Sequence, residues 1–302
     1  MSGQRERIAA IDVGSNTVLL TVAEYDPEVG LVVIEEGEDQ PRLGAGLSAT
    51  GQLSEESIRR ALSTLTTMGD VCKRHGVRRI AAVATAAIRE AGNGPEFVER
   101  ARALDIPLRI ISPETEAALS YRSAAHHFPG GKRQLVADIG GGSLELIGAT
   151  NGRVQLSQSL PLGAVRLTEL GSPLGGLRDH ISRGLSGPLQ LSEWAGSTVI
   201  GSGGTFASLA SMALARRGSP AGPSVHGTVV SAEEVERLLE TLATLSPEQR
   251  RLTPGLKPER ADIIVAGLAV VAELLRAVDA DAVTVSEFGL RDGLLLEMVG
   301  LE

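Results

Sequence analysis

Residues 134–146, QLVADIGGGSLEL, decide the fold of this chain. The apolar start predicts a strand, and the strand is followed by Asp138, Gly140, Gly141, Gly142, Ser143 and Glu145. Consecutive glycines at a strand end let backbone N–H groups approach an anion such as phosphate. Flanking carboxylates suit Mg²⁺, which binds one or two carboxylates together with waters and phosphate oxygens. The stretch therefore predicts a metal and phosphate site, with a hairpin whose glycines serve only the turn as the alternative.

Residues 8–20, IAAIDVGSNTVLL, repeat this pattern. Asp12 takes the place of Asp138, and Gly14, Ser15 and Asn16 take the place of the glycine loop. Both copies continue into a predicted hairpin partner, LVVIEE in the first and VQLSQSL in the second. A repeat at this scale predicts two related domains that face one ligand across a cleft.

Three further segments carry candidate site residues. Residues 199–210, VIGSGGTFASLA, predict another strand, glycine turn and helix, with Gly203, Gly204 and Thr205 as phosphate-binding candidates. Arg89 follows a predicted strand at 77–85, where a solvated surface arginine is the plain alternative. Glu116 lies in the first turn of a helix that Ser112 caps and Pro113 opens. The helix dipole alone favours an acid there, and the competing interpretation is a general base.

The length of 302 residues allows two domains, and strands alternating with helices in both halves predict an α/β fold with mixed sheets. We place the boundary in the turn-rich connector HHFPGGKR, which gives a first domain over 1–125 and a second over 126–302. Adjacent histidines cannot point the same way on a regular element, so His126 and His127 are interpreted as surface-loop residues rather than metal ligands.

Composition excludes several classes of function. Aromatic residues make only 2% of the chain and the net charge is −8, so stacking platforms and basic patches for nucleic acid are disfavoured. The single cysteine, Cys72, permits no intramolecular disulfide and fits a reducing compartment. The N-terminus lacks the apolar stretch of a secretory signal, and no run approaches the ~18 apolar residues of a membrane helix. We expect a cytoplasmic protein with no membrane partner, and a homodimer by default.

The duplicated Asp-Gly strand pair resembles the actin, sugar-kinase and Hsp70 fold, which is ribonuclease H-like. Within that fold, six segments resemble the exopolyphosphatase and guanosine-pentaphosphate phosphatase family. In chain order they are IDVGSNTVLL, ATAAIREAGN, ISPETEAALSY, DIGGGSLELI, IGSGGTFASLA and VSEFGLRDGLL. Together they span nearly the whole chain.

The resemblance implies roles for the matching positions. Glu116 falls on the catalytic glutamate of the family, Asp138 and Glu145 fall on the acids that serve metal and catalysis, and Arg89 falls on a phosphate-contacting arginine. The loops that cradle the phosphates are matched by Ser15, Asn16, Gly141, Gly142 and Ser143. Leu144 stands where the family usually has Thr, and Ala86 replaces a frequent Ser. The chain resembles a short form that ends at 302 without the C-terminal HD-type region of long members.

The resemblance also implies an activity. We expect a hydrolase that releases terminal phosphate from inorganic polyphosphate or guanosine pentaphosphate, with Mg²⁺ or another divalent cation. A kinase of the same fold needs the same glycine loops, and a non-catalytic phosphate sensor is a third interpretation. Phosphate release without an acceptor separates the hydrolase from both alternatives. The sequence leaves open which of the two substrates is used.

Overall fold

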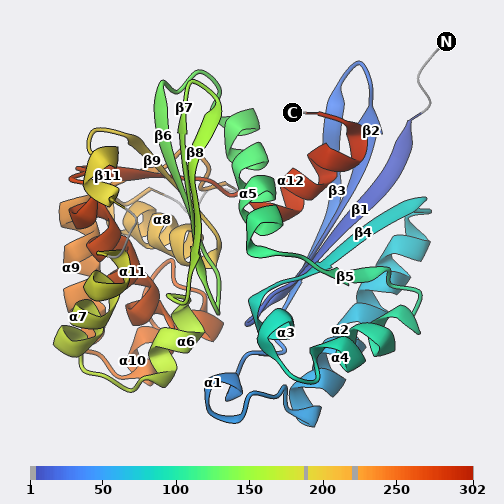
Figure 1. The fold of residues 1–302 in the computed structure, drawn as a ribbon, viewed down its shortest axis with the longest axis horizontal. Coiled ribbons are helices and arrows are strands. Elements are labelled where there is room, and N and C mark those ends of the chain that lie inside the picture. Colours follow the sequence, from blue (N-terminus) through green and yellow to red (C-terminus); the bar gives the residue numbers. More distant parts are fainter. Residues whose placement is uncertain (1–4, 187–189, 220–223, 302) are drawn as a thin grey trace. The chain divides into compact units, whose positions relative to one another are not determined.

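The computed structural model describes residues 5–186, 190–219 and 224–301. Its contacts divide the chain into two units, drawn in Figure 1. Unit 1 comprises Met1–His126 and Leu290–Glu302, and unit 2 comprises His127–Gly289. The structure thus corrects the predicted second domain, 126–302, at its C-terminal end. The apolar residues Leu290, Leu294 and Leu295 of the terminal helix α12 (Leu290–Val299) are buried in a core cluster of unit 1.

Unit 1 is built on a five-stranded mixed sheet. Its order is β3 (Gly30–Asp39), β2 (Val18–Asp26), β1 (Glu6–Val13), β4 (Arg79–Ala84) and β5 (Leu108–Ile110). The strands β1, β2 and β3 form the predicted antiparallel hairpins, and β1, β4 and β5 run parallel. Because side chains alternate along a strand, β1 serves two cores, one through Ala9 and Ile11 and the other through Ile8 and Ala10.

Helices cover both faces of this sheet. The first core is closed by α2 (Glu55–Arg74) and α4 (Gly94–Arg102), and the second by α5 (Pro113–His127) and α12. The helix α2 begins after Ser54, whose side chain accepts a hydrogen bond from the backbone N–H of Ser57. Cys72 lies in the core, and burial raises the pKa of its thiol to about 11. Two short helices, α1 (Leu47–Thr50) and α3 (Ala86–Glu90), complete the unit.

Unit 2 repeats the sheet of unit 1. Its order is β10 (Val229–Ser231), β11 (Ala282–Val285), β9 (Thr198–Ser202), β6 (Arg133–Ile139), β7 (Leu144–Thr150) and β8 (Arg153–Leu160). Counted from β8, the first five strands match β3, β2, β1, β4 and β5 in order and direction, and β10 is added antiparallel at the edge. The duplicated mixed sheet confirms the actin, sugar-kinase and Hsp70 fold class.

The described part of unit 2 contains the α-helices α6 (Ala164–Glu169), α7 (Leu174–Leu185), α8 (Gly204–Arg216), α9 (Ala232–Ala243), α10 (Pro247–Arg250) and α11 (Ile264–Ala277). The helix α11 is apolar and is buried along almost its whole length. No helix within 5–186, 190–219 and 224–301 combines the length and apolar character needed to cross a membrane. The predicted surface loop at the histidines is wrong, because α5 continues to His127 and the His127 ring stacks on Phe288 at 3.7 Å.

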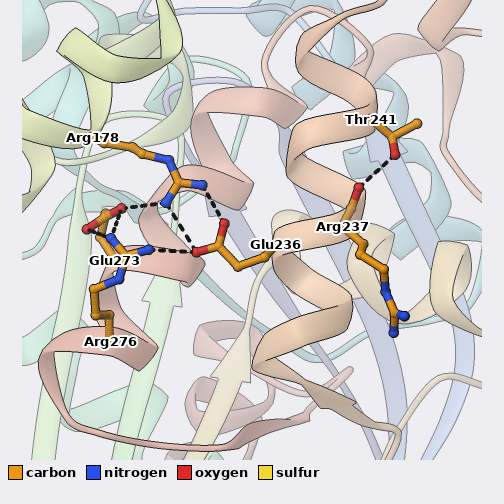
Figure 2. Close-up of polar contacts among 6 residues, drawn as sticks. All are labelled: Arg178, Glu236, Arg237, Thr241, Glu273 and Arg276. Atoms are coloured by element: carbon orange, nitrogen blue, oxygen red, sulfur yellow. Dashed lines mark hydrogen bonds and ion pairs between the residues drawn. The ribbon is translucent and has the colours of Figure 1, made fainter.

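An ion network ties three helices of unit 2 together, as Figure 2 shows. Arg178 of α7 donates to Glu236 of α9 (3.1 Å) and to Glu273 of α11 (2.9 Å). Arg276 of α11 donates to both oxygens of Glu273 and to Glu236, each at 2.9 Å. The side chain of Glu273 is only 5% exposed, so its charge depends on these partners.

Candidate functional site

The predicted site residues lie at or beyond the carboxyl ends of the parallel strands in both units, with Glu145 on β7 opposite Asp138. These strands end at Val13, Ala84 and Ile110 in unit 1 and at Ile139, Ser202 and Val285 in unit 2. Unit 1 carries Asp12, Gly14, Ser15, Asn16, Arg89 and Glu116, and unit 2 carries Asp138, Gly140, Gly141, Gly142, Ser143, Glu145, Gly203, Gly204 and Thr205. Open α/β sheets bind ligands at this edge, so each unit presents its candidates where a ligand is expected.

The two glycine loops have the same backbone turn. In unit 1 the N–H of Gly14 donates to the carbonyl of Thr17 at 3.0 Å, and in unit 2 the N–H of Gly140 donates to the carbonyl of Ser143 at 3.0 Å. Each turn closes a hairpin of the same register, with Val13 opposite Val18 and Ile139 opposite Leu144. The repeat seen in the sequence is therefore a repeat in backbone geometry.

In unit 2 the carbonyls of the glycine loop are anchored by the segment at α6. The carbonyl of Gly140 accepts from the N–H of Ala164 (3.0 Å), and that of Gly141 accepts from Val165 (2.9 Å). The Arg166 Nε donates to the carbonyl of Gly142 (2.9 Å). These peptide bonds are trans, so each carbonyl and the N–H of the next residue point in opposite directions. The N–H groups of residues 141–143 consequently point away from α6, as an anion-binding loop requires.

Gly163 lets α6 approach the loop this closely. A Cβ on Gly163 would lie 2.3 Å from the carbonyl carbon of Gly142 and 2.4 Å from the oxygen of Gly141. Any side chain at position 163 would therefore push the start of α6 away from the loop. The sequence contains Gly163, but its role depends on a close approach that only the structure shows.

A segment that follows β3 anchors the loop of unit 1 in a similar way. The carbonyl of Ser15 accepts from the N–H of Gly44 (2.7 Å), and the carbonyl of Asn16 accepts from the N–H of Arg42 (3.1 Å). A Cβ on Gly44 would lie 3.0 Å from the Cβ of Ser15, so position 44 favours glycine. The N–H groups of Asn16 and Thr17 then point away from this segment. Arg42 and Gly44 thus hold the phosphate-loop candidate, and neither was among the residues that the sequence pointed to.

Asp138 and Glu145 lie side by side across the β6–β7 hairpin. They are direct partners in the antiparallel register, so both side chains are on the same face of the sheet. Glu145 is 2% exposed, and its Oε1 accepts a hydrogen bond from the Ser159 hydroxyl at 2.9 Å. The structure therefore brings together the two carboxylates that the sequence proposed for a metal.

The residues of the third glycine turn, 203–205, have different surroundings: Gly203 is next to Asp138, and Thr205 lies in the core. Gly203 has φ +91°, and a Cβ on it would lie 2.8 Å from Asp138 Oδ1, so Gly203 directly borders the carboxylate. The Arg260 guanidinium covers Gly204, whose Cβ would lie 1.9 Å from the Arg260 Cζ. Thr205 is buried, with its Oγ1 only 2.5 Å from the place of a Cβ on Gly267 of α11. The structure thus places Gly203 beside Asp138 and turns the Thr205 hydroxyl toward α11.

Arg89 and Glu116 form an ion pair in unit 1. The Arg89 Nη1 donates to Glu116 Oε2 at 2.9 Å and to the carbonyl of Ile111 at 3.0 Å. Glu116 is 7% exposed, and the Arg89 side chain is 20% exposed, so neither is an ordinary solvated surface residue. Because Arg89 is held at two points, it fixes the position of the carboxylate.

Ser202 is a site candidate that our sequence analysis missed. It pairs directly with Asp138 between the parallel strands β9 and β6, on the side of Asp138 opposite Glu145. Ser202 is 2% exposed, and its hydroxyl finds no hydrogen-bond partner among the described residues. A serine ending a strand just before two glycines was the available signal in the sequence.

The chain is similar throughout to proteins of one family. A model described as the Ppx/GppA phosphatase family matches residues 21–302. Exopolyphosphatase 1 of Mycobacterium tuberculosis is 29% identical over 308 residues, which cover 98% of this chain and 89% of that protein. Exopolyphosphatase 2 of the same species is 29% identical over 321 residues, which cover 97% and 99%.

Solved structures agree with this result. A Ppx/GppA family member from Aquifex aeolicus is 30% identical, with a TM-score of 0.80 and 98% of both chains covered. An exopolyphosphatase from Cytophaga hutchinsonii is 26% identical, with a TM-score of 0.91 and coverage of 98% of this chain and 99% of that one. The six motifs, the duplicated sheet and these matches lead to one conclusion: the chain belongs to the Ppx/GppA phosphatase family.

Proposed function

We propose that this protein hydrolyses the terminal phosphoanhydride bond of inorganic polyphosphate or guanosine pentaphosphate. The observation that carries the proposal is the loop 140–143, whose carbonyls are anchored while its N–H groups point away from α6, next to two carboxylates. Family membership supports phosphatase chemistry, and several curated relatives are named exopolyphosphatases. Neither the geometry of the loop nor membership of the family distinguishes polyphosphate from guanosine pentaphosphate as the substrate.

The donor set fits Mg²⁺ as the cofactor. Asp138 and Glu145 would hold the cation, since they share one face of the sheet and Glu145 is almost fully buried. Within the described residues, no group of three or more His, Cys, Asp or Glu could hold a metal ion. A pair of carboxylates is nevertheless enough for Mg²⁺, which keeps several waters and completes its shell with phosphate oxygens. Bound Mg²⁺ would offset the negative charge of the substrate oxygens.

The residues of the chain suggest the following roles. The backbone N–H groups of residues 141–143 bind terminal phosphate oxygens and stabilise the charge that develops on them. The oxygen of a water attacks the terminal phosphorus, and the bond from that phosphorus to its bridging oxygen breaks. Glu116 accepts a proton from the attacking water, and the bridging oxygen leaves with the shortened substrate. Arg89 holds the Glu116 carboxylate in position through the 2.9 Å ion pair.

Two other functions are compatible with the glycine loops. A kinase of this fold would transfer the phosphoryl group to an alcohol or acid, and a sensor would bind the phosphates without turnover. The Arg89–Glu116 pair favours catalysis over a sensor, because a carboxylate fixed by an arginine is suited to orient and deprotonate a nucleophile. A kinase would use such a carboxylate on its acceptor hydroxyl, so phosphate release without an acceptor is what separates the hydrolase from the kinase.

Phosphate release tests this function directly. The purified protein is expected to release orthophosphate, without any acceptor, from at least one of long polyphosphate, short polyphosphate and guanosine pentaphosphate. Release should require Mg²⁺ and stop with EDTA, because two carboxylates beside a polyanion would otherwise repel it. Colorimetric phosphate assays on the three substrates in parallel give the measurement. Release that persists in EDTA would overturn the metal assignment, and release that needs an added acceptor would favour the kinase.

A further inference from the structure

Ser202 has an environment that its neighbours do not share. It is the last residue of β9, which lies between β6 and β11 in Figure 1. Its side chain is on the same face of the sheet as Asp138, because the two residues are direct partners in the parallel register. It is 2% exposed, yet its Oγ makes no hydrogen bond in the part of the chain that the structure describes. A buried hydroxyl of this kind calls for a partner from outside the protein.

The space beside Ser202 also receives an oxygen of Asp138. A Cβ on Gly289 would lie 3.6 Å from Asp138 Oδ2 and 3.7 Å from Ser202 Oγ. Both oxygens are therefore within reach of one small volume that the missing side chain of Gly289 leaves open. A single carbon there would already be in van der Waals contact with both oxygens, so a group as small as a water molecule is enough to meet both.

Two other buried serines of this unit, and the half-buried Ser159, have satisfied hydroxyls. The Ser286 hydroxyl donates to the carbonyl of Phe288 (2.8 Å), and the Ser208 hydroxyl donates to the carbonyl of Gly204 (2.8 Å). The Ser159 hydroxyl donates to Glu145 (2.9 Å). Ser202 differs from these three in its unsatisfied hydroxyl and pairs directly with Asp138.

We infer that Ser202 is a positioning residue whose Oγ and Asp138 Oδ2 together bind one water of the Mg²⁺ hydration shell. A metal-bound water donates two hydrogen bonds and therefore needs two acceptors. The Ser202 oxygen and the Asp138 carboxylate converge as such a pair. A phosphate oxygen fits this position less well, because it would face the Asp138 carboxylate without a proton between them. The inference rests on the proposed function, since it assumes the cation at Asp138 and Glu145.

Ser197 provides a matched control. Its hydroxyl is also buried and without a hydrogen-bond partner among the described residues, but it precedes the opposite end of β9. Ser197→Ala and Ser202→Ala thus remove the same group from the two ends of one strand. Only Ser202 is beside Asp138.

The test uses Mn²⁺ as a spectroscopic probe for the cation. Binding of Mn²⁺ to the full chain is measured by electron paramagnetic resonance for wild type, Ser202→Ala, Ser197→Ala and Asp138→Asn. We expect Ser202→Ala to weaken binding by about tenfold or more, as loss of a hydrogen bond to a metal's shell typically does. The Mg²⁺ concentration for half-maximal phosphate release should rise in parallel, while Ser197→Ala leaves both values unchanged.

The outcomes distinguish this inference from the proposed function. If Asp138→Asn weakens Mn²⁺ binding and Ser202→Ala does not, the role of Ser202 is wrong and the metal site stands. If Asp138→Asn also binds Mn²⁺ like wild type, the metal assignment itself is wrong. Thermal unfolding of each variant shows whether it is folded, and Ser202→Cys, which keeps the size of the side chain with a weaker hydrogen-bonding group, replaces the Ala variant if that one does not fold.

Discussion

Replacing Glu116 with Gln is expected to lower the turnover number for phosphate release by about 10² to 10⁴, while substrate binding persists. Gln keeps the size of the side chain, and its amide oxygen can still accept the hydrogen bond that Arg89 donates at 2.9 Å. The basicity is lost, so the attacking water has no carboxylate to take its proton. Initial rates over a range of substrate concentrations separate kcat, which should fall, from KM, which should change little.

Glu114 is the matched control for this experiment. It lies in the same first turn of α5 but is exposed. The hydrogen bond from the Ser112 side chain holds the pKa of Glu114 below its ordinary value, so Glu114→Gln also removes a full negative charge at neutral pH. Turnover of this variant should stay near that of wild type. If Glu116→Gln instead retains turnover within about threefold of wild type, Glu116 is a buried partner of Arg89 and no general base.

The parts of the site that the sequence predicted are those in which one short segment contains the whole feature. The hairpin at 134–146 needs an apolar strand, a glycine turn and a second strand, and all three are adjacent in the chain. The structure confirms the hairpin, and its register pairs Asp138 with Glu145. The position of Glu116 in a helix first turn was likewise local, because Pro113 begins α5 only three residues earlier.

Features that depend on distant segments could not be predicted. The anchoring of Ser15 by Gly44 requires that two loops 29 positions apart in the chain meet, and no periodicity encodes that meeting. Leu144 is a second example. It stands where the family usually has Thr, and its side chain lies in the core of unit 2, on the face of the sheet opposite Glu145. A threonine at that position would place its side chain in the core as well.

The terminal helix shows the same limit at the scale of a domain. Its residues Leu290, Leu294 and Leu295 fit any apolar surface, and chain order alone assigned them to the second domain. In the structure they share a core with Ile8 and Val83 of unit 1. The packing of the C-terminal helix against unit 1 is a tertiary contact, and neither the composition nor the hydrophobic pattern of the sequence predicts it.

The ion network of α7, α9 and α11 gives the second large expected effect. Arg178→Met should lower the free energy of unfolding by about 2 to 3 kcal/mol at neutral pH. Breaking a fully buried ion pair costs about 3 to 5 kcal/mol. The loss expected for Arg178→Met is smaller because the Arg178 side chain is 20% exposed to solvent. The cost arises because Glu273, 5% exposed, would keep only Arg276, whose side chain is 59% exposed. Urea unfolding followed by circular dichroism gives the measurement.

Arg237→Met provides the comparison on the same helix. In Figure 2 its side chain points away from the network, and its backbone carbonyl accepts a hydrogen bond from the Thr241 hydroxyl at 2.7 Å. Its guanidinium pairs with Glu233 at 3.3 Å, where the side chains are 53% and 79% exposed. Exposed pairs of this spacing are worth about 0.3 to 0.5 kcal/mol, so this variant should be close to wild type. Equal losses in the two variants would show that the network adds nothing beyond a surface pair.

The difference between Arg178→Met and wild type should also depend on pH in one direction. The hydrogen bond from Arg178 is the largest cause that holds the pKa of Glu236 below its ordinary value of 4.5. A carboxylate with a lowered pKa in the folded state stabilises it above the unfolded pKa, and this stabilisation is lost as the pH falls through the folded pKa. Without Arg178, Glu236 loses most of that effect. The difference in the free energy of unfolding between wild type and Arg178→Met should therefore be largest at neutral pH and shrink below about pH 4. A difference that stays constant with pH would mean that Arg178 acts through packing of its aliphatic stem alone.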